Sequence, residues 1–249
     1  MLATVRDIGS LTGLSERYAD QVKLLALGMT DESAAAGALM TAIHTFGSLD
    51  VVINNAGYGN LSSVEETPIS DFRAQIETNL FGTIIVTKAA LPYFRERKAG
   101  QFIQFSSLGG RIGLPGRGPY SAAKWGVEGF SEVLSREVAP LGIKVTIVEP
   151  GGFRTDFAGS STKLSEGHSE YDSTVGATAR FQRNYNGKQP GDPKKAAQVI
   201  VQLSQEQKPP LRLLLGSDAY NGAEKNDLER LEEARRWKEL SLSTDFETR

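Results

Sequence analysis

The stretch from Gln101 to Lys124, QFIQFSSLGGRIGLPGRGPYSAAK, contains a strand, a glycine-rich turn and the start of a helix. The apolar residues at 102, 103 and 105 predict a short buried strand that ends at two serines. Six glycines and prolines between 109 and 118 keep the following segment out of regular structure. Apolar side chains then recur at helical spacing from Trp125 to Val138 and predict a long helix that starts near Tyr120.

This arrangement brings three chemically useful side chains within reach of one another. Tyr120 and Lys124 are four residues apart, so on a helix they share one face, and Ser107 stands at the end of the strand. A free phenol, with a pKa of about 10, is a poor base near neutral pH, and a nearby ammonium lowers that pKa. A serine hydroxyl can donate a hydrogen bond to a carbonyl oxygen. The three residues could polarise a carbonyl, although Tyr-x-x-x-Lys alone also arises by chance on helices.

Taken with its other motifs, the chain resembles the single-domain short-chain dehydrogenases/reductases over essentially its whole length. The thirteen-residue step from Ser107 to Tyr120 is also the family's step. The resemblance implies an α/β fold: one Rossmann-like domain over residues 1–249, with a doubly wound parallel sheet and helices on both faces. Residues 152–190 would form a loop or lid over the substrate. The matching motifs, in chain order, are Asn54-Asn55-Ala56-Gly57, Asn79, Ser107, Tyr120-x-x-x-Lys124 and Pro150-Gly151 followed by Thr155.

The resemblance also implies roles for these residues. Ser107 and Tyr120 would hold the substrate oxygen, and Tyr120 would give or take its proton. Lys124 would lower the pKa of the tyrosine and bind the ribose of the nicotinamide, and Asn79 would hold a water in a proton relay. Asn79 in the middle of a helical pattern could equally mark a local kink. The implied cofactor-binding residues are Arg6, Met29, Asn55, Ala56, Gly57, Tyr120, Lys124, Pro150, Gly151, Phe153 and Thr155.

Arg6 determines the expected cofactor. It follows an apolar segment that resembles the end of the family's second strand, where an arginine meets the 2′-phosphate of NADP. A guanidinium suits phosphate, so NADP is expected rather than NAD, as in hydroxysteroid and retinol dehydrogenases. An arginine merely solvated at a strand end is the alternative. Where the family commonly has an adenine-binding aspartate, this chain has Gly28, which leaves the backbone of Met29 for that contact.

The family's Thr-Gly-x-x-x-Gly-x-Gly turn has no counterpart in the chain. That turn, with its flanking strand and helix, holds the pyrophosphate, so about 30 residues of a βαβ unit are expected to be missing at the N-terminus. Two apolar strand edges would then be exposed within the sheet. Three hypotheses follow: an oxidoreductase whose true start lies upstream, a shortened and catalytically inactive homologue that acts in binding or association, and an epimerase or dehydratase with the same triad.

Composition limits the remaining possibilities. With 249 residues and a net charge of −2, the chain is expected to form one domain without nucleic-acid or acidic membrane partners. It has no apolar run near the ~20 residues of a membrane span and no signal-peptide pattern. The absence of cysteine fits a cytoplasmic enzyme, and two isolated histidines predict no metal site. We expect a bulky, partly apolar carbonyl or alcohol as substrate, and a homodimer or homotetramer formed through the long helices.

Overall fold

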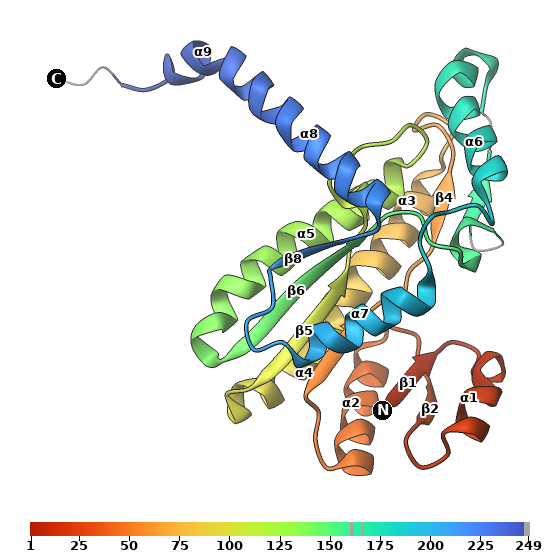
Figure 1. Cartoon of the computed structure of the whole chain (residues 1–249), viewed down its shortest axis with the longest axis vertical. Helices are drawn as coiled ribbons and strands as arrows, with labels where there is room; N and C mark the ends of the chain where they lie inside the picture. The colour runs from red at the N-terminus through yellow and green to blue at the C-terminus, as the bar shows by residue number, and fades with distance from the viewer. Residues whose placement is uncertain (160–161, 166, 247–249) are drawn as a thin grey trace.

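The computed structural model describes residues 1–159, 162–165 and 167–246. The main strands run parallel and lie in two sheets (Figure 1). The smaller sheet pairs β1 (Leu2–Val5) with β2 (Lys23–Ala26), in a register that sets Leu2 beside Lys23. The larger sheet has the order β3 (Val51–Asn54), β5 (Gly100–Phe105), β6 (Ile143–Pro150) and β8 (Arg212–Leu215). In the described residues, β1 and β3 are not hydrogen-bonded to each other, so both present a free edge.

Helices cover both faces of the larger sheet because successive side chains of its strands point to opposite faces. Phe102 of β5 packs against Phe94 and Leu134, which belong to α4 (Gly82–Arg97) and α5 (Gly118–Val138). Its neighbour Ile103 packs on the other face, against α7 (Pro193–Gln205). Next to α4 lies α2 (Glu32–Phe46). The predicted doubly wound α/β arrangement is therefore confirmed.

The long helical pattern from Ile69 to Arg97 contains a π-helical turn. It divides into α3 (Ile69–Ile76), the π turn η2 (Glu77–Phe81) and α4. Asn79, a poor helix former, lies in the π turn with no exposed surface. The sequence indicated that Asn79 could mark a local kink, and the structure shows a π turn that points the Asn79 side chain into the protein. Such π turns are often found at functional sites.

The segment predicted as a long polar loop contains regular structure. It includes β7 (Thr162–Leu164), which pairs with β4 (Gly59–Leu61), and the helix α6 (Ala177–Tyr185). Val175 and Ala179 are buried against Leu61, and this small apolar cluster fixes the segment on the domain. Short helical turns link these elements: η5 (Asp156–Ala158), η6 (Ser169–Tyr171) and η7 (Asp172–Gly176).

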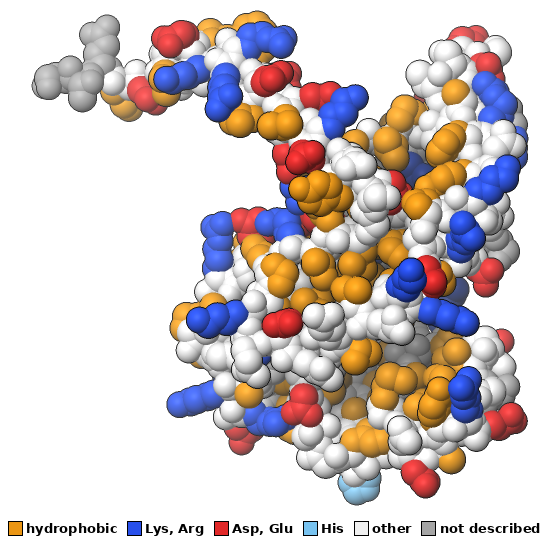
Figure 2. Space-filling model, viewed as in Figure 1, with side chains coloured by type: hydrophobic (Ala, Val, Ile, Leu, Met, Phe, Trp, Pro, Cys, Tyr) orange, Lys and Arg blue, Asp and Glu red, His pale blue; other side chains and the backbone are white. Residues whose placement is uncertain are grey.

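The C-terminal part of the chain forms a charged helix, α8 (Ser217–Arg236), which is followed after Trp237 by the short α9 (Lys238–Leu242). It projects from the domain (Figure 1), and side chains of both charges alternate along it (Figure 2). No helix in the described part of the chain is long and apolar enough to cross a membrane. The remaining elements are α1 (Thr12–Arg17) and the 3-10 turns η1 (Ile8–Leu11), η3 (Leu108–Gly110) and η4 (Ala139–Leu141).

Candidate active site

The predicted site residues gather where the strands end. Because the strands of each sheet are parallel, their carboxyl ends lie along a common edge, where α/β proteins bind ligands. Each segment named from the sequence follows a different strand: Arg6 follows β1, Met29 follows β2, Asn55–Gly57 follow β3, Ser107 follows β5, and Gly151–Thr155 follow β6.

Ser107 and Tyr120 meet directly. A β-carbon placed on Gly109 would lie 3.5 Å from Ser107 Oγ and 3.4 Å from Tyr120 Cε1, and the Ser107 hydroxyl lies close enough to the phenol to lower the pKa of Tyr120. Ser107 Oγ also accepts a hydrogen bond of 3.0 Å from the Gly109 amide, which caps the short turn η3 and fixes the hydroxyl. The thirteen-residue loop therefore folds back so that strand end and helix start touch.

Burial controls the protonation of the phenol. Tyr120 is 8% exposed, and burial raises its pKa; the Ser107 hydrogen bond and the Arg117 guanidinium lower it but do not cancel the rise. The residue that supplies positive charge to the phenol is thus Arg117, whereas the sequence pointed to Lys124. In this environment Tyr120 holds its proton at neutral pH.

Lys124 lies one helical turn beyond Tyr120, as predicted, but its ammonium is engaged elsewhere. Its Nζ lies 5.9 Å from the centre of the Tyr120 ring and donates a hydrogen bond of 2.7 Å to the Phe105 carbonyl at the end of β5. Burial lowers the pKa of Lys124 to about 8, against the opposing charge of Glu128. The lysine therefore remains mostly a cation at neutral pH, with its head group held at the end of β5.

Asn79 lies beside Lys124. Its Oδ1 accepts a hydrogen bond of 3.1 Å from the Tyr58 amide, and its Nδ2 donates to the Tyr58 carbonyl at 2.9 Å and to Gln75 Oε1 at 2.7 Å. A β-carbon on Gly57 would fall 2.8 Å from Asn79 Oδ1 and 3.6 Å from Lys124 Nζ. The loop after β3, the π turn and the helix α5 therefore converge on Gly57.

The loop after β6 is tied to neighbouring elements. The Gly151 amide donates to the Leu215 carbonyl at 2.9 Å, and the Gly152 amide donates to Asp218 Oδ2 at 2.7 Å. Phe153 pairs with Gly191 through an isolated β-bridge. Thr155, exposed in this structure, caps η5 by accepting a hydrogen bond of 3.4 Å from the Phe157 amide. These contacts hold the Pro150–Thr155 segment beyond the end of β6.

Arg6 and Met29 belong to the smaller sheet. Arg6 is exposed just after β1. The Met29 side chain packs on α4, where a β-carbon at Gly82 would lie 2.6 Å from Met29 Cγ. This contact with Gly82 ties the smaller sheet to the helices of the larger one.

The sequence did not predict that Phe157 and Arg117 would lie next to Tyr120. The Phe157 ring lies 5.5 Å from the Tyr120 ring, centre to centre. Arg117 donates to the Asn60 carbonyl at 3.2 Å and also contacts Gln182 Oε1 of α6. Arg117 is three residues before Tyr120, and this spacing puts both residues on one helix face. The sequence alone could therefore have identified Arg117 as a neighbour of Tyr120. Phe157 and Gln182 carry no comparable signal, because their proximity depends on how the 156–190 segment folds.

Comparisons with known proteins identify the family. The model of the family described as short chain dehydrogenase matches residues 9–165, which is more than half of the chain. The protein therefore belongs to the short-chain dehydrogenases/reductases. It is 45% identical over 247 residues to oxidoreductase BOA17 of Botryotinia fuckeliana (strain B05.10), a match that covers 98% of this chain and 89% of that protein. Its class is accordingly that of an oxidoreductase.

Solved structures agree with this assignment. The crystal structure of a short-chain dehydrogenase from Streptomyces avermitilis matches with a TM-score of 0.90 and 36% identity, covering 98% of this chain and 90% of the other. An alcohol dehydrogenase from the archaeon Thermococcus sibiricus, complexed with 5-hydroxy-NADP, matches with a TM-score of 0.67 over 86% of this chain and 84% of its own. At 20% identity, the second likeness concerns the fold alone.

Proposed function

We propose that the protein is an NADP(H)-dependent oxidoreductase that interconverts a carbonyl and an alcohol at Ser107, Tyr120 and Lys124. The observation that carries this proposal is the convergence of the Ser107 and buried Tyr120 side chains beside Gly109, with the ammonium of Lys124 one helical turn away. Two hydroxyls that converge on one point can bind a single carbonyl oxygen, and membership of an oxidoreductase family supports this use.

In this mechanism the residues manage the proton. Because burial keeps the Tyr120 phenol protonated, it donates a proton to the oxygen of the reduced carbonyl. Ser107 donates a second hydrogen bond to the same oxygen, and Lys124 supplies positive charge while Asn79 fixes the loop beside it. The nicotinamide, when bound, supplies or accepts the hydride. A neutral phenol is the form that gives a proton when the carbonyl is reduced.

The described residues fit one end of the dinucleotide better than the other. At the nicotinamide end, Tyr120, Lys124 and Thr155 offer hydroxyl and ammonium groups suited to ribose and carboxamide. At the pyrophosphate end, the described segments between β1 and α1 and between β2 and α2 each contain a single glycine, Gly9 and Gly28, rather than a glycine-rich turn. We assign Lys124 to the nicotinamide ribose and Asn55–Gly57 to the adenosine ribose. The segment assigned to the nicotinamide consists of Pro150, Gly151, Phe153 and Thr155.

The preference for NADP rests on Arg6. Its exposed guanidinium stands at the carboxyl end of β1 and suits a phosphate. The Thermococcus enzyme that shares the fold holds 5-hydroxy-NADP, which supports the same choice. For the substrate, the Phe157 ring that packs on Tyr120 supports a bulky, partly apolar carbonyl compound.

Association through the long helices is a further part of the proposal. Trp125 and Val133 of α5, and Phe81 just before α4, are exposed at 39%, 57% and 47%, which is costly for large apolar side chains in water. We assign this helix surface to a homodimer or homotetramer contact. Light scattering after size-exclusion chromatography tests it: Val133→Glu should yield a lower mass than the unchanged chain.

The cofactor proposal is tested by titrating the purified 249-residue chain with NADPH and with NADH, following nicotinamide fluorescence and thermal shift together. Saturable binding of NADPH with stabilisation, followed by reduction of at least one compound in a set of bulky ketones and aldehydes, is the expected result. A folded chain that binds neither nucleotide would contradict the proposal and favour a protein that keeps these residues without turnover.

A further inference from the structure

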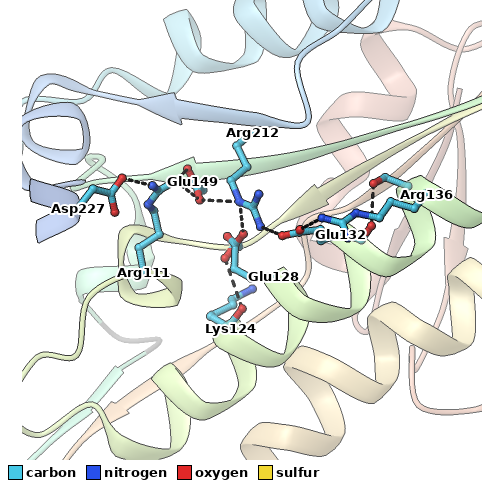
Figure 3. Close-up of polar contacts among 10 residues, drawn as sticks. Arg111, Lys124, Glu128, Glu132, Arg136, Glu149, Arg212 and Asp227 are labelled. Carbon is cyan, nitrogen blue, oxygen red and sulfur yellow. Dashed lines mark hydrogen bonds and ion pairs between the residues drawn. The ribbon is translucent and has the colours of Figure 1, made fainter. Parts of the chain in front are cut away.

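A line of buried charges leads away from the catalytic helix. Lys124 and Glu128 are one turn apart on α5 and so share a face, and they are only 4% and 7% exposed. Lys124 reaches the end of β5, whereas Glu128 reaches the sheet at β8, where Arg212 Nε lies 3.0 Å from Glu128 Oε2. In Figure 3, Glu128 lies between Arg212 and Lys124.

The second carboxylate oxygen of Glu128 is unusual. Glu128 Oε1 is buried and has no hydrogen-bond partner within the described part of the chain. A buried acceptor without a partner costs stability, and Arg212 already satisfies the other oxygen. A carboxylate that served only to bind Arg212 would not need to sit against the helical turn that holds Lys124.

Glu128 is held in place by a larger cluster (Figure 3). Arg212 also binds Glu132 Oε2 through its Nη2 at 2.7 Å and lies 3.8 Å from Glu149 Oε1. Glu149, with no exposed surface, binds Arg111 at 3.1 Å, and Arg111 in turn contacts Asp227 of α8. Four elements therefore fix the position of the Glu128 carboxylate.

Few charges face Lys124 directly. From α5 it meets the Tyr120 ring and Glu128, and from the loop after β3 and the π turn it meets Gly57 and Asn79. Within the described residues, Glu128 is the one group whose charge raises the pKa of Lys124, against the lowering that burial causes. Glu132 lies one turn farther along α5 and is 34% exposed in its side chain.

We propose that Glu128 is a positioning residue for Lys124: held by Arg212, its buried carboxylate lies one turn from Lys124 on the same face of α5 and keeps the ammonium a cation in the site. This inference rests on the proposed function, in which the Lys124 ammonium supplies positive charge in the site and binds the nicotinamide ribose. The cluster of Arg111, Glu149 and Arg212 then acts on the reaction indirectly, by holding Glu128. None of these groups touches the reacting oxygen.

The test measures the protonation of Lys124 in the cofactor-free protein. Lysine labelled with ¹³C at the ε-carbon is followed by NMR from pH 6 to 10.5, and the Lys124 signal is assigned by its loss in Lys124→Met. In the unchanged chain Lys124 should titrate near 8. Glu128→Gln should lower that pKa by about one unit or more, whereas the control Glu137→Gln, at an exposed glutamate near the end of α5, should leave it unchanged. A folded Glu128→Gln protein whose Lys124 titrates like the unchanged chain would overturn the proposal.

A second variant guards against loss of folding. Glu128→Asp keeps the charge but withdraws it by one methylene, so the pKa of Lys124 should fall between those of the unchanged chain and Glu128→Gln. If Glu128→Gln does not fold, a value for Glu128→Asp equal to that of the unchanged chain overturns the proposal by itself.

Activity provides the separate readout. With NADPH and an active ketone, kcat/KM should lose its alkaline limb about one pH unit earlier in Glu128→Gln, and Glu137→Gln should follow the unchanged profile. An unchanged chain without turnover would refute the proposed function, while the NMR titration would still decide whether Glu128 holds the charge of Lys124. An active Glu128→Gln enzyme with an unshifted profile would refute the role of Glu128 alone.

Discussion

Gly57 faces Asn79 so closely that a β-carbon at position 57 would lie 2.8 Å from Asn79 Oδ1 and 3.6 Å from Lys124 Nζ. Asn79 cannot move aside cheaply, because its amide makes three hydrogen bonds to Tyr58 and Gln75. The glycine of the Asn-Asn-Ala-Gly motif is therefore required by the packing of two functional residues against the loop.

Gly57→Ala should displace Asn79 or Lys124 and reduce kcat by about 10–100-fold, because small misplacements of catalytic groups are costly. Overpacking should also destabilise the fold by about 1–3 kcal/mol. The matched control is Gly129→Ala on α5, where a β-carbon meets nothing within 4 Å. Steady-state kinetics and urea unfolding of both variants check this, and equal activity of the two would show that the loop tolerates the methyl group.

Tyr120→Phe removes the proton donor and keeps the ring. We expect turnover to fall by about 10²–10⁴-fold, the usual contribution of a general acid, while NADPH binding stays largely intact. Tyr220→Phe, at a tyrosine that is 56% exposed on α8, is the control for loss of a hydroxyl. Undiminished turnover in Tyr120→Phe would remove this residue from the role of acid.

Much of this site could be predicted from the sequence because strong local patterns carry it. The apolar runs of β5 and β6 mark buried strands, and the four-residue step from Tyr120 to Lys124 marks one helix face. The π turn at Asn79 was not predictable in the same way, since the apolar stripe of α3 and α4 continues through it. One widened turn changes the direction of the Asn79 side chain without interrupting the hydrophobic pattern.

Other features depend on contacts between distant segments. The polar 156–190 segment folds partly into α6 because Val175 and Ala179 find Leu61, far away in the sequence. Likewise, Lys124 bonds the Phe105 carbonyl, and Arg117 supplies the charge near Tyr120. Residue spacing gives the helix face of a side chain, but the partner on the neighbouring strand is set by the packing of the whole domain.

Arg6→Ala should separate the two nucleotides. A charge-assisted hydrogen bond contributes about 1.5–3 kcal/mol, so the Kd for NADPH should rise by about 10–100-fold, while the Kd for NADH should hardly change. Arg17→Ala, at another exposed arginine of the same N-terminal region, should leave both values unchanged. Parallel fluorescence titrations check this; equal weakening of NADPH and NADH would take Arg6 away from the 2′-phosphate.

Glu149 should make the stability of the protein depend on pH. Burial, reinforced by Glu128 and opposed by Arg111, raises the pKa of Glu149 to about 7 from an ordinary value of 4.5. The folded protein thus binds more protons than the unfolded chain in this range, so the contribution of Glu149 is fully present below pH 4.5 and is lost as the pH rises through 7.

Relative to Glu149→Gln, the unchanged chain should therefore lose up to about 3 kcal/mol of unfolding free energy between pH 4.5 and 7.5. Urea unfolding of both proteins over that interval measures the difference in slope. The interval ends at pH 7.5 because Lys124, whose folded pKa is lowered to about 8, acts in the opposite direction above it: the unfolded chain then binds the additional proton, and stability rises with pH. Parallel slopes for the two proteins up to pH 7.5 would mean that Arg111 and Arg212 hold Glu149 as a carboxylate throughout.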